Sequence, residues 1–212
     1  METQKIKIAV VVLNWNGKAW LEKFLPSLVN NSLESTVFVA DNGSEDGSKF
    51  FITQDFPAVK IIENKENLGF AKANNQGIKV AVGDYLILLN NDTEVTNNWL
   101  DELIAVAESE EQIGIVGSLL FYPDGRHIQH AGVRIAKNGD NIWPYHSHFL
   151  EYYTERYNEI KTQQFQVVTG ACMLVKRDTI NKVGLLDESF INGYEGTIEE
   201  GDIFLTNDPY SC

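Results

Sequence analysis

An unbroken apolar run, YLILL at positions 85–89, ends abruptly in the polar residues Asn90, Asn91, Asp92 and Thr93. A run of this kind, without polar alternation, is typical of a strand buried on both faces of a sheet. In open α/β sheets, ligands bind at the carboxyl ends of the strands, where these amides and this carboxylate are expected. Asp92 is an oxygen ligand suited to a hard divalent cation. The alternative is an Asx turn, in which the same side chains bond only local backbone. This stretch alone does not decide between them.

The rest of the chain repeats a rhythm of strand, loop and helix. Alternation of this kind predicts βαβ units and a mainly parallel sheet with right-handed crossovers. Residues 122–164 mix Gly, His, Asn and aromatic residues without a period, which indicates an irregular, partly hairpin excursion, and no element is predicted after about residue 195. The predicted strands cover residues 6–13, 36–40, 59–63, 85–89, 113–120 and 165–175, the last interrupted at 169–171, and the predicted helices cover residues 19–29, 47–54, 70–82 and 99–109.

Charge and composition exclude some classes of function. The 212-residue chain carries a formal net charge of -13, which argues against a nucleic-acid-binding protein because phosphate backbones are held by Lys and Arg. A local phosphate site is still compatible with this charge, since a metal or backbone amides can neutralise one phosphate group. The two cysteines, Cys172 and Cys212, have no disulfide-framework or metal-ligand spacing, so a reducing compartment is expected. The sequence shows no signal peptide and no run of about 18 apolar residues, so we expect a cytoplasmic protein.

Polar clusters follow several of the predicted strands. They read NWNG at 14–17, DNGS at 41–44 and NNDT at 90–93, and the loop after the third strand adds NLGF at 67–70 and Asn74. Clusters that converge on one sheet edge would form a pocket able to bond a base and ribose and to hold a diphosphate through a metal. Neither GxGxxG after the first strand nor a Walker-type GxxxxGK[ST] is present. The sequence therefore predicts a nucleotide pocket without the usual glycine loop.

The ordered series of motifs resembles family 2 nucleotide-sugar glycosyltransferases of the GT-A fold, most closely the bacterial rhamnosyltransferase-like branch. The motifs are VVVLNWNG at 10–17, DNGSEDGS at 41–48, ENLGFAKANNQGI at 66–78 and YLILLNNDTE at 85–94, followed by GACMLVKR at 170–177 and VGLLDESF at 183–190. The resemblance covers roughly residues 5–195. It implies an α/β fold with a mainly parallel central sheet flanked by helices.

The resemblance also implies roles for individual residues. The end of the first strand and the DNGS turn would line the donor pocket, and the NLGF segment with Asn74 would contact the nucleotide and sugar. In place of the family's aspartate-rich metal motif this chain has Asn90-Asn91-Asp92, so Asp92 is the expected ligand of Mn²⁺ or Mg²⁺ and Asn90 a weaker neutral contributor. A site with a single carboxylate depends on phosphate oxygens and water, so weak metal affinity is expected without nucleotide. The implied donor-binding residues are Asn14, Asn16, Asp41, Asn42, Asn67, Gly69, Phe70, Asn74, Asn90 and Asn91.

On the acceptor side the resemblance implies roles for Gly170, Ala171, Asp187 and Glu188. Relatives carry their catalytic base, an Asp, in a YED-like motif soon after the LDESF segment; here the chain reads Tyr194-Glu195-Gly196, so Glu195 is the candidate base. The family pattern stops there. Either the chain is truncated or altered after about residue 195, which we favour, or Glu195 has taken over as the base. We expect a GT-A domain over residues 1–195, with a nucleotide-binding half at about 5–120 and an acceptor-side half at about 121–195, and an unassigned tail at 196–212.

The activity implied is an inverting, metal-assisted transfer of a sugar from a UDP- or dTDP-linked donor to a saccharide or lipid-linked acceptor. The analogy places this step in cell-surface polysaccharide synthesis at the inner face of the cytoplasmic membrane, with peripheral membrane association. Two other classes stay open: a non-catalytic module that binds nucleotide-sugars, and a nucleotidyltransferase, which would need a basic glycine-rich phosphate loop near the N-terminus. The aromatic residues between 143 and 157 either stack on a sugar acceptor or pack against one another.

Overall fold

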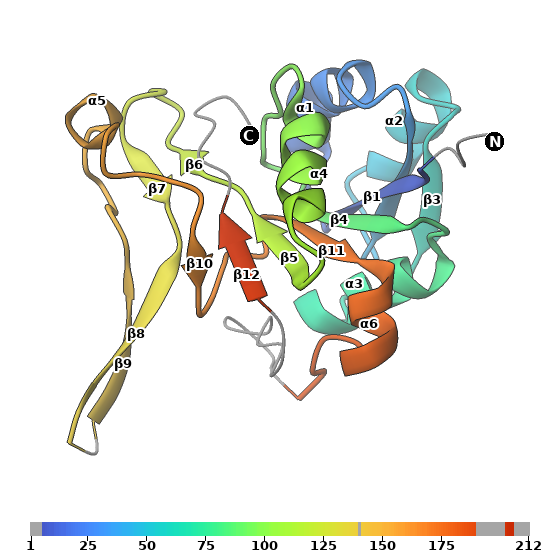
Figure 1. Cartoon of the computed structure of the whole chain (residues 1–212). Coiled ribbons are helices and arrows are strands. Elements are labelled where there is room, and N and C mark those ends of the chain that lie inside the picture. The colour runs from blue at the N-terminus through green and yellow to red at the C-terminus, as the bar shows by residue number, and fades with distance from the viewer. Residues whose placement is uncertain (1–5, 140, 190–201, 206–212) are drawn as a thin grey trace, which may run out of the picture.

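The computed structural model describes residues 6–139, 141–189 and 202–205; for Ile142 and residues 202–205 it describes the backbone alone. Strands and helices alternate through the first half of the chain, as Figure 1 shows. The elements are β1 (Ile8–Asn14), α1 (Lys18–Asn30), β2 (Ser35–Asp41), α2 (Ser48–Asp55), β3 (Lys60–Glu63), α3 (Phe70–Val80), β4 (Tyr85–Asn90), α4 (Trp99–Ser109), β5 (Ile113–Gly117), β6 (Leu120–Phe121), β7 (Ile128–His130), β8 (Val133–Asn138), β9 (Asn141–His146), α5 (Tyr153–Arg156), β10 (Gln164–Phe165), β11 (Cys172–Lys176), α6 (Arg177–Val183) and β12 (Asp202–Leu205).

The central sheet has the strand order β10-β12-β5-β11-β4-β1-β2-β3. The strands from β3 to β4 run parallel, as the βαβ rhythm predicts. β11 enters between β4 and β5 and runs antiparallel to both. The prediction of a mainly parallel α/β sheet is therefore confirmed for the half of the sheet that carries the polar strand ends.

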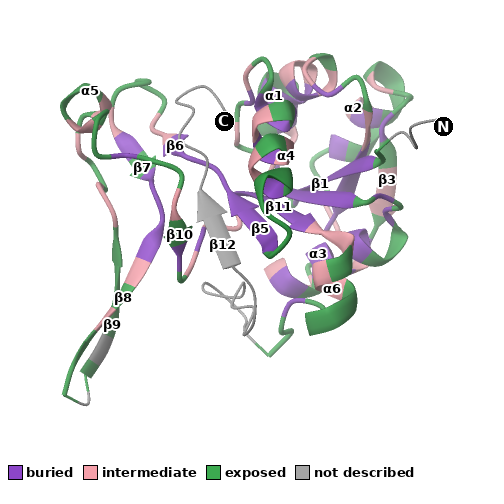
Figure 2. Ribbon diagram, viewed as in Figure 1, coloured by how far each residue is buried: buried purple, intermediate pink, exposed green. Residues whose placement is uncertain are grey.

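Helices cover both faces of the sheet, and alternate residues of each strand supply the two cores. Val10 and Val12 of β1 lie in the core beneath α1, α2 and α4. Val11 lies in the opposite core, beneath α3 and α6. A strand turns successive side chains to opposite faces, so only a run that is apolar at every position can fill both cores. In Figure 2 these central strands are buried almost throughout.

The excursion between β6 and β10 holds a short antiparallel pair, β6–β7, and a longer ribbon, β8–β9. The ribbon extends away from the sheet, and most of its outer part is exposed (Figures 1 and 2). Its aromatic neighbours pack in part against one another: the rings of Phe121 and Tyr153 meet edge to face with their centroids 5.2 Å apart. Trp143 and Tyr145 stay 44% and 46% exposed. Some aromatic rings of this excursion therefore pack against one another, and others are exposed to solvent.

Two predictions about the elements are wrong. The single strand expected over residues 113–120 is divided into β5, which stays in the central sheet, and β6, which pairs with β7 in a separate two-stranded sheet. No element was expected after about residue 195, yet residues 202–205 form β12, which runs parallel to β5. The short run DIFL stands among acidic and polar residues, and its pattern alone did not indicate a strand. Among the described residues, no helix has the length and apolar character needed to span a bilayer.

Candidate functional site

The ends of three neighbouring strands meet at one edge of the sheet. In the parallel register, Asn14 of β1 lies opposite Asp41 of β2, and Leu13 lies opposite Asn90 of β4. Parallel strands bring their carboxyl ends to the same edge, so polar residues that are 27 to 77 positions apart in the chain become neighbours. This edge is where the sequence predicts the donor pocket.

Asn14 is fully buried and stands at the centre of a hydrogen-bond network. Its Nδ2 donates to Asp41 Oδ2 at 3.0 Å and to Ser44 Oγ at 3.2 Å, and its Oδ1 accepts from Asn91 Nδ2 at 2.7 Å. Asp41 Oδ1 accepts from the backbone N–H of Ser44 at 2.9 Å. A buried carboxylate and two amides are thereby satisfied by one another. The network fixes the ends of β1, β2 and β4 as one rigid unit.

Gly17 allows this network to close. A Cβ at that position would lie 2.0 Å from Asn91 Nδ2 and 2.5 Å from Asn14 Oδ1, so any side chain would occupy the place of the hydrogen bond between them. Glycine is required here for close approach, since its φ of -110° is open to any residue.

The loops after β1 and β2 are joined by further hydrogen bonds. Ser44 Oγ accepts from the N–H of Asn16 at 2.9 Å, and Asn16 Oδ1 accepts from the N–H of Glu45 at 2.8 Å. Asp46 Oδ2 accepts from the N–H of Lys18 at 2.7 Å. Asn16 holds a left-handed φ of 47°, a conformation that Asn tolerates better than most residues. Asn16 therefore shapes the loop, and its side-chain oxygen is already engaged.

A second network connects β2 to the loop before α3 through Asn42, which is 2% exposed. Asn42 Nδ2 donates to Asn67 Oδ1 at 2.7 Å and to the Gly69 carbonyl at 3.3 Å. Its Oδ1 accepts from Asn64 Nδ2 at 3.2 Å and from the N–H of Leu68 at 2.9 Å. Asn42, Asn67 and Gly69 therefore lie together, and they do so by bonding one another.

Helix α3 begins at this edge. Gly69 precedes it with φ 81° and ψ 179°, a region that is essentially restricted to glycine. Asn74, one turn into the helix, is 1% exposed, and its Nδ2 donates to the Phe70 carbonyl at 3.1 Å. Among the described residues, Asn74 Oδ1 has no hydrogen-bond partner although it is buried. A buried acceptor without a donor is costly, which makes this atom a candidate contact for a ligand donor.

The candidate metal ligands follow β4. Asn90 is half-buried and Asp92 is exposed at the open edge of the sheet. The donor set of one carboxylate with amide oxygens suits Mg²⁺ or Mn²⁺, which keep water and phosphate oxygens in the remaining positions. No group of three or more His, Cys, Asp or Glu side chains is assembled for a metal in the described part of the chain. The residues fit a metal held jointly with a diphosphate, and they do not form an all-protein cage.

The acceptor-side residues divide into two places. Ala171 and Gly170 precede β11 and touch the donor side directly: the Ala171 carbonyl accepts from the N–H of Asn90 at 2.9 Å, and a Cβ on Gly170 would lie 2.8 Å from Phe70 Cζ. Asp187 and Glu188 lie in the exposed loop after α6. There Asn75 Nδ2 donates to Glu188 Oε1 at 3.0 Å. The candidate base Glu195 lies outside the described residues.

Bonds to Ser189 lower the pKa of Asp187. The backbone N–H of Ser189 contributes most and donates to Asp187 Oδ1 at 2.8 Å, and the Ser189 hydroxyl adds a second bond. Both bonds stabilise the charged carboxylate.

Sequence reasoning gave no role to Ser44, Asp46 or Asn75. Ser44 and Asp46 belong to the quoted DNGSEDGS string, so their place in the motif was the available signal. Asn75 and His130 bond partners far away in the chain. His130 Nε2 accepts from the N–H of Thr169, beside Gly170, at 3.2 Å. Burial lowers the pKa of His130 to about 4, helped by the nearby His146.

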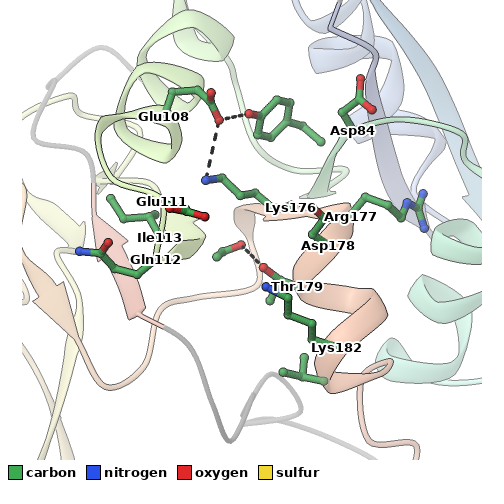
Figure 3. A pocket seen from close by; sticks show the side chains of 13 residues that line it. Asp84, Glu108, Glu111, Gln112, Ile113, Lys176, Arg177, Asp178, Thr179 and Lys182 are labelled. Carbon is green, nitrogen blue, oxygen red and sulfur yellow. Dashed lines mark hydrogen bonds and ion pairs between the residues drawn. The ribbon is translucent and has the colours of Figure 1, made fainter.

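A separate pocket of about 560 Å³ lies at the opposite edge of the sheet, where β4 and β5 begin and β11 ends (Figure 3). Glu108 accepts there from the hydroxyl of Tyr85, and Lys176 Nζ lies 3.7 Å from Glu108 Oε1. Burial and these carboxylate contacts raise the pKa of Tyr85. None of the predicted site residues that the structure describes lines this pocket, so it is distinct from the polar strand ends.

The family model described as Glycosyl transferase family 2 matches residues 9–184. An uncharacterized protein of Sinorhizobium fredii, y4gI, is 34% identical over 197 residues, which are 89% of this chain and 20% of that protein. The N-acetylglucosaminyl-diphospho-decaprenol L-rhamnosyltransferase of Mycobacterium tuberculosis is 28% identical over 214 residues, covering 92% of this chain and 69% of that enzyme. The chain thus spans about a fifth of one relative and about two thirds of the other.

Solved structures share the fold. GalNAc-T7 with UDP, GalNAc and Mn²⁺ superposes with a TM-score of 0.71 at 20% identity, over 95% of this chain and 42% of that one. The mannosyltransferase PcManGT of Pyrobaculum calidifontis, in complex with GDP-Man and Mn²⁺, gives a TM-score of 0.63 at 15% identity, over 93% of this chain and 50% of that one. The predicted GT-A fold is confirmed.

Proposed function

Because the chain belongs to glycosyl transferase family 2, we propose that it transfers a sugar from a nucleotide-diphosphate donor to a saccharide or lipid-linked acceptor, as an inverting enzyme. The observation that supports this most strongly is the network Asp41–Asn14–Asn91, which holds three strand ends rigidly at the ligand-binding edge of the sheet. A preorganised polar edge lowers the cost of binding a polar ligand.

The donor nucleotide would occupy the edge between β1, β2 and the start of α3. Asp41 and Asn14 would line its base pocket. Asn74 would contribute the buried Oδ1 that lacks a protein partner, and it would accept a hydrogen bond from the nucleotide or sugar. We propose that residues 5–120 form this donor half and residues 121–195 the acceptor half. We propose a UDP- or dTDP-linked donor, and the name of the rhamnosyltransferase relative supports a rhamnosyl-like sugar on it.

The metal proposed is Mn²⁺ or Mg²⁺, held by Asp92 with help from Asn90. Two of the solved relatives contain Mn²⁺ together with a nucleotide or nucleotide-sugar. When bound, such a cation neutralises charge that develops on the leaving diphosphate. The chain's own contribution is to orient the diphosphate at the exposed edge after β4, where Asp92 faces solvent.

The acceptor would approach from the side of Gly170 and the loop that carries Asp187 and Glu188. Displacement with inversion needs a base that removes the proton of the acceptor hydroxyl, and we propose Glu195 for this role. The name of the mycobacterial relative contains a decaprenol-linked acceptor. It supports a lipid-linked acceptor for this chain as well, and with it peripheral association with the inner face of the cytoplasmic membrane in surface polysaccharide synthesis.

Calorimetric titration tests the donor site. The chain would be titrated with UDP, dTDP and GDP, each with Mn²⁺ and with a chelator, alongside Asp92→Ala and the control Glu94→Ala. Glu94 is an exposed carboxylate two positions on, so its removal matches the change of charge. We expect one nucleotide to bind with metal, and we expect Asp92→Ala but not Glu94→Ala to weaken that binding.

Three other outcomes would contradict parts of the proposal. Equal binding with metal and with chelator would reject the metal site. Binding of a nucleotide without turnover of any of its sugar derivatives would favour a nucleotide-sugar-binding module. If no nucleotide binds while the thermal melt is cooperative, the chain is folded and the donor site is wrong.

A further inference from the structure

Asn75 of α3 holds the loop after α6 by three hydrogen bonds. Its Nδ2 donates to the Leu186 carbonyl at 2.8 Å, and its Oδ1 accepts from the Leu186 N–H at 3.0 Å. The same Nδ2 donates to Glu188 Oε1 at 3.0 Å. One side-chain amide therefore pairs with both backbone groups of a residue 111 positions away. Asn75 is 1% exposed and Leu186 9%, so neither partner is well hydrated if the pairing is broken.

The helix that carries Asn75 is itself tightly fixed on the sheet. Gly77 packs so closely on β1 that a Cβ there would lie 2.3 Å from Val11 Cγ1. The C-terminal end of α3 is tied to the start of α6 by Arg177, whose guanidinium donates to the Ile78 carbonyl at 3.1 Å and to the Ala81 carbonyl at 2.5 Å. α6 is thus anchored to α3 at its beginning by Arg177, and just past its end by Asn75.

This double anchoring connects the two halves of the candidate site. Phe70 and Asn74, the donor-side candidates, lie on the first turns of α3, and Asn75 is the next residue along the same helix. Its partners Leu186 and Glu188 flank the acceptor-side candidate Asp187. Any displacement of this loop changes the distance between donor-side and acceptor-side groups without altering a donor contact.

We propose that Asn75 is a positioning residue for sugar transfer, which sets the acceptor-side loop at a fixed distance from the bound donor. This inference rests on the proposed function. Misplacing a reacting group by about 1 Å can slow an enzyme on the order of 100-fold. Loss of Asn75 therefore lowers kcat roughly 10- to 100-fold, while the KM for the donor and the affinity for the nucleotide stay within about twofold of wild type.

Three variants of the full chain separate the possibilities. Asn75→Ala removes all three hydrogen bonds. Asn75→Asp keeps an acceptor for the Leu186 N–H but removes the donor and sets a second carboxylate beside Glu188. Gln76→Ala, at the neighbouring and half-buried position, is the matched control. The double variant Asn75→Asp with Glu188→Gln restores an amide–carboxylate pair with its polarity reversed, so it is expected to regain part of the lost rate.

Hydrogen exchange gives a readout that needs no substrate. The Leu186 amide is expected to be protected in wild type and Gln76→Ala, and to exchange at least tenfold faster in Asn75→Ala, while the amides of β1 and β4 keep their protection. Protection of those strands shows that the variant is folded. Unchanged exchange at Leu186 in Asn75→Ala would overturn the anchoring role.

Kinetics with a sugar derivative of the bound nucleotide decide the functional part. A fall in kcat at unchanged donor KM supports positioning. A parallel loss of nucleotide affinity would move Asn75 into the donor site, and an unchanged kcat would reduce it to a structural residue; either result overturns the proposal. If wild type binds nucleotide without turnover, the role in transfer is rejected for this chain. If it binds no nucleotide, the proposed function fails, whereas the exchange result still decides the anchoring.

Discussion

Asn14 and Asp41 lie opposite each other on neighbouring parallel strands, and their side chains are joined by a hydrogen bond of 3.0 Å between Nδ2 and Oδ2. Both residues are almost fully buried, at 0% and 2% exposure. A carboxylate buried at a strand end is stable only because Asn14 and the N–H of Ser44 donate to it. The pair links the backbone register of the sheet to the shape of the proposed donor pocket.

The first prediction concerns this pair. Asp41→Asn replaces one of the two carboxylate oxygens with an NH₂ group, which donates and does not accept. One of the two hydrogen bonds, from Asn14 Nδ2 or from the Ser44 N–H, is therefore lost. We expect a loss of about 1–3 kcal/mol in the free energy of unfolding, measured by urea denaturation, and a weaker nucleotide affinity in calorimetry. Asp55→Asn, at the exposed end of α2, is the control. Equal effects of the two changes would show that the Asp41 network contributes nothing specific.

The second prediction concerns Gly17. Gly17→Ala places a methyl group in the path of the hydrogen bond between Asn91 and Asn14, so that bond must open. We expect the affinity for nucleotide to fall about tenfold, equivalent to about 1.4 kcal/mol. Gly125→Ala makes the same chemical change at a position with φ 64° and no neighbour within 4 Å, so it tests stability alone. Retained affinity in Gly17→Ala would mean that the Asn14–Asn91 bond does not shape the pocket.

The location of the site follows from sequence because it depends on where buried strands end. The apolar runs of β1, β2 and β4 stop at Asn14, Asp41 and Asn90, and consecutive parallel strands must align those ends. What the individual residues do within the cluster does not follow. Asn16 and Asn42 are predicted as donor contacts, yet their side-chain groups bond neighbouring loops. A motif shows which residues gather, and the structure shows which of their atoms are already used.

Long-range polar contacts escape sequence reasoning altogether. Asn75 is one of two adjacent asparagines, and nothing local distinguishes it from Asn74; its partner is 111 positions away. His130 sits in a stretch without period, and it bonds Thr169, 39 positions further on. Side-chain bonds of this kind depend on how separate elements pack, and periodicity carries no information about that.

The third prediction uses His130. Its pKa is about 4 in the folded chain, mainly because burial disfavours the charged imidazole, and is about 6.5 when unfolded. Between these values only the unfolded chain binds the proton, so stability falls as the pH drops from 6.5 to 4. The loss from this residue is on the order of 3 kcal/mol, at about 1.4 kcal/mol for each pKa unit.

The measurement is urea denaturation at a series of pH values. His130→Gln keeps an acceptor for the Thr169 N–H but does not titrate, so we expect its stability to depend less steeply on pH between 4 and 6.5 than that of wild type. Gln76→Ala, a half-buried position whose change removes no titratable group, serves as the control and should keep the wild-type slope. A wild-type slope in His130→Gln would contradict the buried, neutral state of His130.

The last prediction tests the contact between the acceptor-side turn and the donor segment. In Gly170→Ala the new Cβ would lie 2.8 Å from Phe70 Cζ and 3.3 Å from Cε1, so the ring at the start of α3 must move. The outer end of a half-buried ring shifts at small cost, so we expect less than about 1 kcal/mol of lost stability. A displaced Phe70 would disturb the sugar more than the base, because its ring lies against Gly170 on the proposed acceptor side. The affinity for the nucleotide-sugar should therefore fall, while the affinity for the free nucleotide is kept.

A second change, Phe70→Leu, replaces the ring with a shorter side chain and removes the clash with the new methyl group. The double variant should recover the stability lost in Gly170→Ala without recovering the affinity for the nucleotide-sugar. If Gly170→Ala instead weakens nucleotide and nucleotide-sugar equally, Phe70 acts on the nucleotide itself, and its proposed effect on the sugar is wrong.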